Sequence, residues 1–241
     1  MKFRTQLGLL VPLLGLLLSS GPAVAEDPRW PLWPSELQRI HKAFAPNEEG
    51  IEVPDTERLA AIRVTDAYAT PLIEPILLQA LKDSSVQVVR DALIRCIERE
   101  ILACTPESET IWANTRSTTS LRMYALRVLL LDPTKEHVDH LLAAMQSADP
   151  QIRTVAVRLA VEVRLPPKHL TRVRSQLVAK LSDGVPNVRQ TALRSLGTLG
   201  PGSGALTVVR QLEDPTPQVR REAGRTMNVR VFHPIVELVN E

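Results

Sequence analysis

The sequence of 241 residues predicts an all-α fold in which pairs of helices repeat along the chain. An apolar residue followed four positions later by alanine recurs five times, and the alanines lie 33, 31, 36 and 31 residues apart. The copies are VVRDA (88–92), LRMYA (121–125), IRTVA (152–156), VRQTA (188–192) and VRREA (219–223). A period of this length indicates stacked units, because one pair of helices cannot bury its apolar face alone.

Each unit is interpreted as two helices joined by a turn. Apolar columns in the first helix lie seven positions before the motif (Leu81, Met145, Leu181, Leu212) and ten before it (Leu78, Ile111, Leu142, Val178, Val209). The turns are DSS at 83, ADP at 148, DGVP at 183 and DPTP at 214. An acid in such a turn caps backbone N–H groups of the second helix, and proline suits its first turn.

Both ends of the array are expected to be covered. Residues 55–69 place Ala61 in register with the motif and predict a half-unit, and residues 34–45 predict a helix with Ser35 as its N-cap. That helix should carry Leu37, Ile40 and Phe44 on one face. Residues 45–54 should form a loop, and residues 233–241 a last short helix over the final pair.

The segment LEDPTPQVRREAG (212–224) resembles HEAT repeats, particularly the short bacterial, PBS-lyase type with the pattern L-x-D-P-x-P-x-V-R-x-x-A. LSDGVPNVRQTALRSLGTLG (181–200) is nearly as close. The resemblance covers about residues 71–230 and implies a HEAT-like α-solenoid of about five helix pairs with degenerate N-terminal capping helices. It implies little about function, since HEAT arrays serve as scaffolds, adaptors and, less often, enzymes. The first two units depart from the pattern, with Val89 in the arginine slot and Arg116 in place of the turn acid.

Residues 1–25 have the features of a secretory signal peptide. Lys2 and Arg4 precede the 12-residue apolar run 7–18, and Ala23-Val24-Ala25 is an A-x-A cleavage site. The run is too short for a membrane span of about 20 residues, and no later segment is apolar enough for one. We therefore expect cleavage after Ala25 and export, to a periplasm or outside the cell. The expected organisation is 1–25 signal peptide, 26–54 N-terminal Trp/Pro segment and capping helix, and 55–241 repeat array.

Removing Lys2 and Arg4 with the signal changes the charges from 29 basic and 27 acidic to 27 of each, so the mature chain is neutral. The charges are nevertheless unevenly distributed. Residues 26–113 carry 9 Lys and Arg against 16 Asp and Glu, whereas residues 151–230 carry 14 against 5. The array is thus acidic toward its start and basic toward its end.

One arginine column is predicted to be structural. At about 100° per residue, the apolar slot, the alanine and the apolar residue eight positions after the slot define a buried arc centred at about 60°. The arginine after the slot falls inside that arc, and a buried charge needs a partner. The column is Arg122, Arg153, Arg189 and Arg220. The resemblance to HEAT arrays implies a ladder in which turn acids of the same or the next unit, namely Asp149, Asp183 and Asp214, supply the partners.

A second column, two positions after each alanine, is predicted to face solvent opposite the buried arc. It consists of Arg63, Arg127, Arg158, Arg194 and Arg225 and is interrupted at Ile94. The resemblance implies that second helices line a concave surface, so the column would form a basic stripe there. We expect Arg127, Arg158, Arg194 and Arg225 to bind a partner; the alternative is an ordinary solvated charged face.

No metal site, cofactor or catalytic residue is predicted. His137 and His140 lie one turn apart in HVDH, but a metal site needs a third ligand, and none is evident. No His is followed by Glu, which argues against the HEAT-built deoxyhypusine hydroxylases. GPGSG (200–204) follows a helix and lacks the phosphate-loop lysine, so it is interpreted as a turn.

Two further features leave alternatives open. Cys96 lies in a core column, and its Cα atom would be about 12 Å from that of Cys104 on one unbroken helix, beyond the limit of about 7 Å for a disulfide. If the helix ends near Glu100, the chain could fold back and join them. The segment DPRWPLWP (27–34) is either a lid over the first helix or a sugar- or peptide-binding segment.

Together these features predict an exported, non-catalytic interaction scaffold or adaptor whose partner is a protein or another acidic macromolecule. One rival is an enzyme resembling the bilin lyases, against which the lack of a convergent acid, base or thiol argues. The other is a nucleic-acid-binding protein similar to the HEAT-fold DNA glycosylases. The neutral mature chain and the expected export argue against that rival.

Overall fold

The computed structural model describes residues 34–44, 53–200 and 204–228, and in these ranges the chain forms α-helices and short 3₁₀ turns without any strand. This confirms the predicted all-α, HEAT-like fold. The first six helices are α1 (Ser35–Ala43), α2 (Asp55–Val64), α3 (Thr70–Ala80), α4 (Val86–Glu98), α5 (Thr105–Ala113) and α6 (Thr119–Leu129). The other six are α7 (Lys135–Met145), α8 (Pro150–Glu162), α9 (Pro167–Ala179), α10 (Pro186–Leu199), α11 (Ala205–Arg210) and α12 (Pro217–Asn228).

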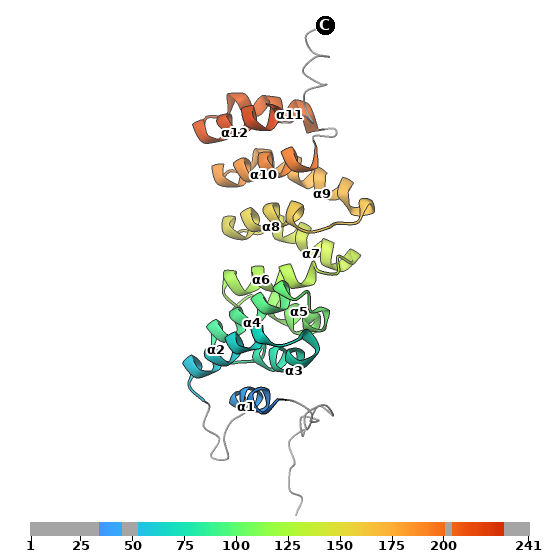
Figure 1. Ribbon diagram of the computed structural model, residues 1–241. Coiled ribbons are helices and arrows are strands. Elements are labelled where there is room, and N and C mark those ends of the chain that lie inside the picture. The colour runs from blue at the N-terminus through green and yellow to red at the C-terminus, as the bar shows by residue number, and fades with distance from the viewer. Residues whose placement is uncertain (1–33, 45–52, 201–203, 229–241) are drawn as a thin grey trace, which may run out of the picture. The chain divides into compact units, whose positions relative to one another are not determined.

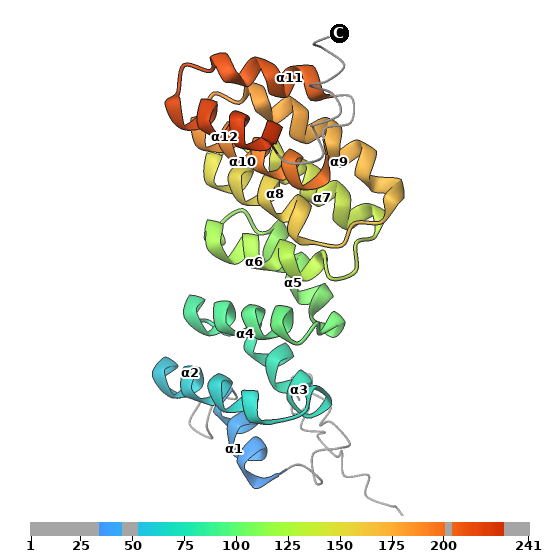
Figure 2. The same ribbon diagram turned by 45° about the horizontal axis from the view of Figure 1, so that its top comes forward.

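The helices alternate between two layers (Figures 1 and 2). The even-numbered helices, which carry the repeated motif, pack one against the next from α2 to α12. The odd-numbered helices form the other layer and contact their even-numbered partners. In the part of the chain that the structure describes, no helix is long and apolar enough to cross a membrane.

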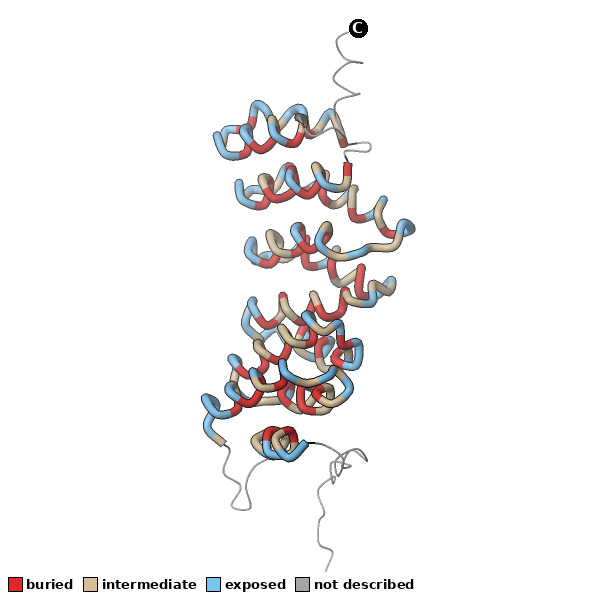
Figure 3. The backbone as a smooth tube through the Cα atoms, in the orientation of Figure 1, coloured by how far each residue is buried: buried red, intermediate tan, exposed pale blue. Residues whose placement is uncertain are grey.

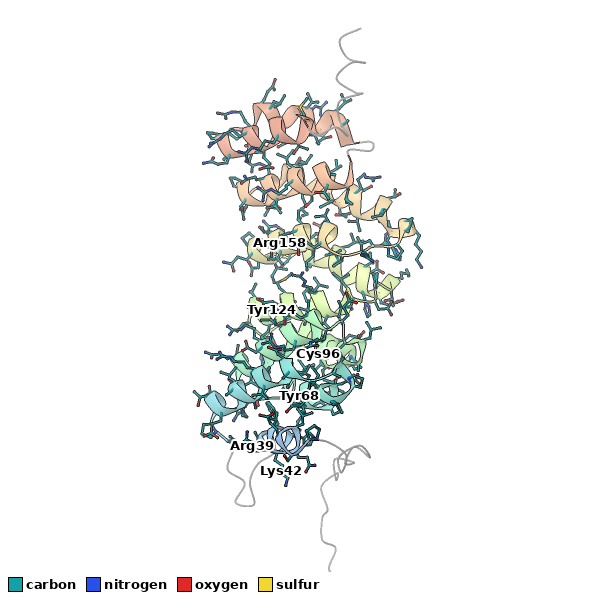
Figure 4. The ribbon with its side chains drawn as sticks, viewed as in Figure 1. Arg39, Lys42, Tyr68, Cys96, Tyr124 and Arg158 are labelled. Carbon is teal, nitrogen blue, oxygen red and sulfur yellow. A yellow bond between two sulfur atoms is a disulfide. The ribbon has the colours of Figure 1, made fainter. Side chains whose placement is uncertain are left out.

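The two predicted capping helices form a helix pair of their own. Helix α1 packs on α2 and α3, and α2 packs on α4, so α1 and α2 repeat the arrangement of the later units. The Tyr68 hydroxyl also donates a hydrogen bond to the Glu36 carboxylate of α1, and Figure 4 shows Tyr68 beside this helix. The described array therefore contains six helix pairs.

Buried residues recur along the helices, on the faces turned toward neighbouring helices (Figure 3). In the first helices the buried positions are four residues apart, as in Leu77 with Leu81 and Leu141 with Met145. The column predicted ten positions before the motif lies one residue off this face, and Leu78 and Leu142, for example, are half-buried. The motif alanines of α4 to α12 are fully buried, because successive second helices approach each other there.

The last unit differs from the predicted core pattern. Leu212 and Val209 are 40% and 39% exposed, although the corresponding residues of earlier units are buried or half-buried. No described helix follows to cover them. The predicted final helix, residues 233–241, lies outside the described residues, as do residues 45–52 of the predicted loop, the Trp residues of the N-terminal segment and the signal segment 1–25.

Helix α4 ends early enough for Cys96 and Cys104 to form a disulfide. The helix stops at Glu98, and Glu100 has a φ of 52°, in the left-handed region that favours glycine. The Ile101 N–H donates to the Cys96 carbonyl at 2.9 Å, which closes the turn. The two Cα atoms are 6.4 Å apart, and both side chains are fully buried. The alternative left open by the sequence is thereby decided in favour of a bridge.

Candidate functional site

Two rungs of the predicted arginine ladder are paired, and their side chains are at most 14% exposed. Arg153 donates two hydrogen bonds to Asp183, at 2.8 and 2.9 Å, and Arg189 donates two to Asp214, at 2.7 and 2.9 Å. In each case the arginine bonds the acid of the next unit, and its remaining nitrogen donates to carbonyls of its own turn. A guanidinium in this position links three backbone segments, so its role is structural.

A third rung, which the sequence analysis did not predict, joins α2 to α4. Arg58 stands three residues before Ala61, the same slot as in the later motifs, and its Nε lies 2.8 Å from the Asp83 carboxylate. Both side chains are buried, at 6% and 7% exposure. The signal was present in the register of Ala61. The column predicted from the sequence starts at Arg122 and does not include Arg58.

The acids that serve the ladder lie at one position of each turn, two residues before the N-cap of the second helix. There Asp83, Asp183 and Asp214 each accept the N–H two residues later as well as the arginine. Asp149 does not belong to this set, which corrects the sequence prediction. It is itself the N-cap of α8, accepting the Gln151 N–H at 2.8 Å, and its other oxygen accepts from Thr119.

Ser147 occupies the ladder position of that turn and has no charge to offer Arg122. Arg122 instead donates to the Trp112 carbonyl at 3.1 Å, and its guanidinium carbon lies 4.8 Å from the centroid of the Trp112 ring. The rung between α4 and α6 is missing at both ends, since Val89 replaces its arginine and Arg116 its acid. Because both the arginine and the acid of this rung are absent, no buried charge is left unpaired, and the missing ion pair costs little stability.

Arg220, the last member of the column, is exposed, which corrects the prediction that it is buried. It donates to the carbonyls of Asp214 and Pro215 in its own turn, at 2.7 and 3.1 Å. No described unit follows α12, so the turn aspartate that would pair with Arg220 has no equivalent among the described residues. Among the described residues, this column therefore forms an ion pair only where the turn of the next unit supplies an aspartate.

The ladder pairs change the protonation equilibria of their acids. The Arg189 hydrogen bonds outweigh the effect of burial and hold the pKa of Asp214 below its ordinary value of 3.8. Burial by itself would raise the pKa of Asp183, but the hydrogen bonds from Arg153 and the Val185 N–H outweigh it, and that pKa is also lowered. Both acids are thus ionised in the folded protein at neutral pH.

The second arginine column faces solvent, as its helical phase predicts. The side chains of Arg127, Arg158, Arg194 and Arg225 are 43%, 57%, 62% and 76% exposed, and Arg63 is also exposed. They lie on successive even-numbered helices, one per unit; Arg158 is labelled on α8 in Figure 4. Their role in binding a partner stays a prediction.

Two glutamates organise these arginines into pairs, a feature that the sequence analysis missed. Glu162 lies 3.6 Å from Arg127 of the preceding unit and 3.2 Å from Arg158 of its own helix. Glu222 lies 3.0 Å from Arg194 of the preceding unit and 3.9 Å from Arg225. We call these groups the two arginine clamps. Each has two guanidinium groups around one carboxylate and keeps a net positive charge. The spacing of four residues between Arg158 and Glu162, and of three between Glu222 and Arg225, could have predicted the pair within each helix.

A pocket of about 490 Å³ adjoins the first clamp. It lies where α4, α6 and α8 end, between three successive units. Its apolar lining is Ile97, Leu102, Leu130, Leu131 and Val163, and its charged lining is Glu100, Arg127, Glu162 and Arg164. The pocket thus combines an apolar floor with part of the predicted binding surface.

The other candidates from the sequence analysis are the histidines of HVDH and the GPGSG turn. His137 is buried, with Nδ1 2.5 Å from the Asp132 carbonyl and Nε2 3.4 Å from Glu109, while the His140 ring lies 6.1 Å from the Trp112 ring. Over residues 34–44, 53–200 and 204–228, no three His, Cys, Asp or Glu side chains gather as a metal site would require. Residues 201–203 of GPGSG lie outside the described ranges.

No protein-family model matches the sequence, and no curated protein is significantly similar to it. Among solved structures, the chain is similar to an engineered protein at 16% identity, covering 80% of this chain and 96% of that one with a TM-score of 0.48. It is also similar to human deoxyhypusine hydroxylase in complex with glycerol, at 11% identity, covering 83% and 96% of the two chains with a TM-score of 0.39. Neither likeness bears on what this chain does, and the description of its architecture rests on its own helices.

Proposed function

We propose that the protein is an exported, non-catalytic interaction module that binds an acidic macromolecular partner, a protein above all, along its even-numbered helices. The observation that carries this proposal is the pair of arginine clamps. Their four guanidinium groups are at least 43% exposed, and each clamp has one more positive than negative charge. A planar guanidinium offers two parallel donors to a carboxylate, which suits recognition of acidic groups.

The clamps also hold their arginines ready for a ligand. Because Glu222 is only 7% exposed and contacts both Arg194 and Arg225, it restrains two long side chains that would otherwise be mobile. A partner that binds restrained side chains loses less conformational entropy. The spacing of one arginine per unit extends this surface over several helices, as an extended acidic segment requires.

Export is supported by two independent features. The signal-like residues 1–25 predict it, and the Cys96–Cys104 disulfide agrees with it, because structural disulfides persist mainly in oxidising compartments. Among the described side chains, no group combines a nucleophile, a base and a residue that orients the base, so none of them supports an enzymatic function.

The test is capture of the native partner by cross-linking in the cells that make the protein. The double variant Arg158→Glu with Arg194→Glu reverses one arginine in each clamp and should reduce capture about tenfold or more. The matched control is Lys168→Glu with Arg210→Glu, which makes the same charge change on exposed residues of α9 and α11 and should leave capture intact.

Far-ultraviolet circular dichroism should show equal helix content in both double variants. Undiminished capture by the clamp variant would disprove binding on the even-numbered helices. Retained binding of duplex DNA at physiological salt, with no acidic protein captured, would favour the nucleic-acid alternative.

A further inference from the structure

We infer that the clamps bind a segment of the partner polypeptide that is in the polyproline II conformation and has an acidic residue at every third position. This inference rests on the proposed function and adds the form in which the partner presents its acidic groups. It combines the exposed arginines with a second column of polar side chains on the same helices and with the distance between neighbouring helices.

A column of uncharged polar residues accompanies the arginines. The second residue of each even-numbered helix from α4 to α12 is exposed, and its side chain ends in an amide or, once, in a hydroxyl group. We call these residues the polar column; they are Gln87, Ser120, Gln151, Asn187 and Gln218. On α8, α10 and α12 the column consists of amides alone, one for each unit.

Helix stability does not account for the polar column. The positive end of a helix dipole favours an acid in the first turn, yet none of these five helices has an acid there. The side-chain amides of Gln151 and Gln218 form no hydrogen bond with a described residue, and that of Asn187 forms one long bond, of 3.5 Å, to the Thr154 hydroxyl. These amides are therefore available to a ligand.

The polar column and the arginines lie on the same face of each helix. The arginine follows the polar residue by seven positions, as Arg158 follows Gln151, and seven residues make about two turns and rise about 10 Å. A side-chain amide offers both donors and an acceptor, which match the C=O and N–H groups of a peptide backbone. A DNA backbone offers acceptors only. A polypeptide lying over the amides would direct its carboxylates along the helices toward the arginines.

The stacking of the helices sets the spacing of the acidic residues. Successive even-numbered helices from α6 to α12 lie side by side (Figure 1), and packed helices are about 8 to 10 Å apart. A polyproline II segment has three residues per turn, so its side chains return to the same side about every 9.3 Å. In a β-strand that distance is about 6.8 Å, which does not match the helices. One acidic side chain for each helix therefore requires acids three residues apart.

The charges of α8, α10 and α12 favour such a ligand. These helices carry seven arginines and no lysine, against two glutamates, Glu162 and Glu222. Two of the arginines pair with ladder acids, which leaves an excess of three positive charges. The polar column lies in the first turns of the helices, where the helix dipole adds a partial positive charge.

The test compares three synthetic peptides of identical composition and charge. The first repeats Glu-Pro-Ala four times, so that one glutamate is available to each of Arg127, Arg158, Arg194 and Arg225. The second has its four glutamates at alternate positions, and the third has them side by side at one end. Fluorescence polarisation at about 0.05 M salt should give a dissociation constant about tenfold or more lower for the first peptide.

Changes in the polar column test the contact with the backbone. Gln151→Ala and Gln218→Ala each remove one amide without changing the charge, and each should raise the dissociation constant of the first peptide about fivefold. The matched control is Gln87→Ala, at the same position of α4, where Ile94 stands in place of the arginine. Its effect should be less than about twofold, and melting temperatures verify that all three variants fold.

Equal affinity for the three peptides, or no binding of the first, would overturn the inference, as would equal effects of the three glutamine changes. Binding of oligodeoxythymidylate of the same net charge as tightly as the first peptide would also overturn it. If Arg158→Glu with Arg194→Glu abolishes capture of the native partner while the spacing of glutamates has no effect, the proposed function stands and only this inference fails. If that double variant leaves both capture and peptide binding intact, both fail.

Discussion

At the scale of single residues, the arginine that follows the apolar slot joins its own unit to the next. Arg58, Arg153 and Arg189 each contact an acid 25 to 30 residues further along the chain, and no side chain of these pairs is more than 14% exposed. Arg220, without a following described unit, contacts only its own turn. Whether this arginine joins two units thus depends on the unit that follows it and not on the local motif alone.

Replacing Arg189 by alanine should lower the melting temperature clearly. The change leaves the buried Asp214 carboxylate without its partner, and removing one member of a buried pair typically costs about 3 kcal/mol. Thermal unfolding monitored by circular dichroism measures the loss. The control is Arg225→Ala, whose side chain is 76% exposed and should hardly affect stability. Equal effects of the two changes would contradict the assignment of the two columns.

The ladder also predicts a dependence of stability on pH. Because the pKa of Asp214 is lower in the folded state than its ordinary value of 3.8, its contribution is complete well above pH 3.8 and is lost as the pH falls through the folded value. The difference in melting temperature between the parent protein and Asp214→Asn should therefore be constant above about pH 5 and narrow below pH 3.8. Glu213→Gln, a change at the exposed neighbouring residue, is measured in parallel for comparison.

At the scale of elements, a unit is defined by the turn that joins its two helices. In three turns an aspartate binds both the N–H two residues later and an arginine of the preceding unit. In the turn before α8, Ser147 accepts the Asp149 N–H at 3.2 Å and so keeps the turn without the ion pair. The fold therefore tolerates a missing rung as long as the turn itself is satisfied.

Ser147→Asp should restore the missing rung between α6 and α8. The new carboxylate would stand where Asp183 and Asp214 stand in later turns, within the reach expected for Arg122, and should stabilise the protein by about 1 kcal/mol. A double-mutant cycle with Arg122→Ala measures whether the gain depends on the ion pair. A coupling energy near zero, or equal stabilisation in the Arg122→Ala background, would show that the rung does not form.

At the scale of the whole described array, the first arginine column joins successive units, and we propose that the second column binds the partner. The ladder pairs lie between units and are shielded from solvent, whereas the clamps lie on the exposed face of the even-numbered helices. Exposed charges are screened by salt over about 8 Å at physiological ionic strength, and buried pairs much less. Salt should therefore act differently on binding and on stability.

Raising the salt concentration from about 0.05 to 0.5 M should weaken binding of the native partner steeply while changing the melting temperature little. Titration of the partner at several ionic strengths, alongside thermal melts in the same buffers, tests both statements. Binding that does not respond to salt would contradict recognition by the clamps. A melting temperature that falls in parallel would mean that the ladder pairs are accessible to solvent.

The sequence alone determined the helical repeat and the phase of its second helices. The recurring apolar residue and alanine predicted every even-numbered helix from α4 to α12, and the phase correctly placed Arg158 and Arg194 on the exposed side. These properties follow from 3.6 residues per turn and are local, so they can be derived without knowing how the units stack. The local pattern predicted Ser35 as the N-cap of the first helix. In the structure Ser35 is the first residue of α1, and Pro34 is the N-cap.

The tertiary structure decided which side chains from different units meet. The clamp of Arg127, Glu162 and Arg158 joins residues of two units, and the pocket beside it draws on three. The positions of helix ends decided two further points. Ser147, and not Asp149, holds the ladder position of its turn, and Cys96 is bridged to Cys104. Contacts between units are set by packing between residues about 25 to 30 positions apart, which periodicity along one helix does not encode.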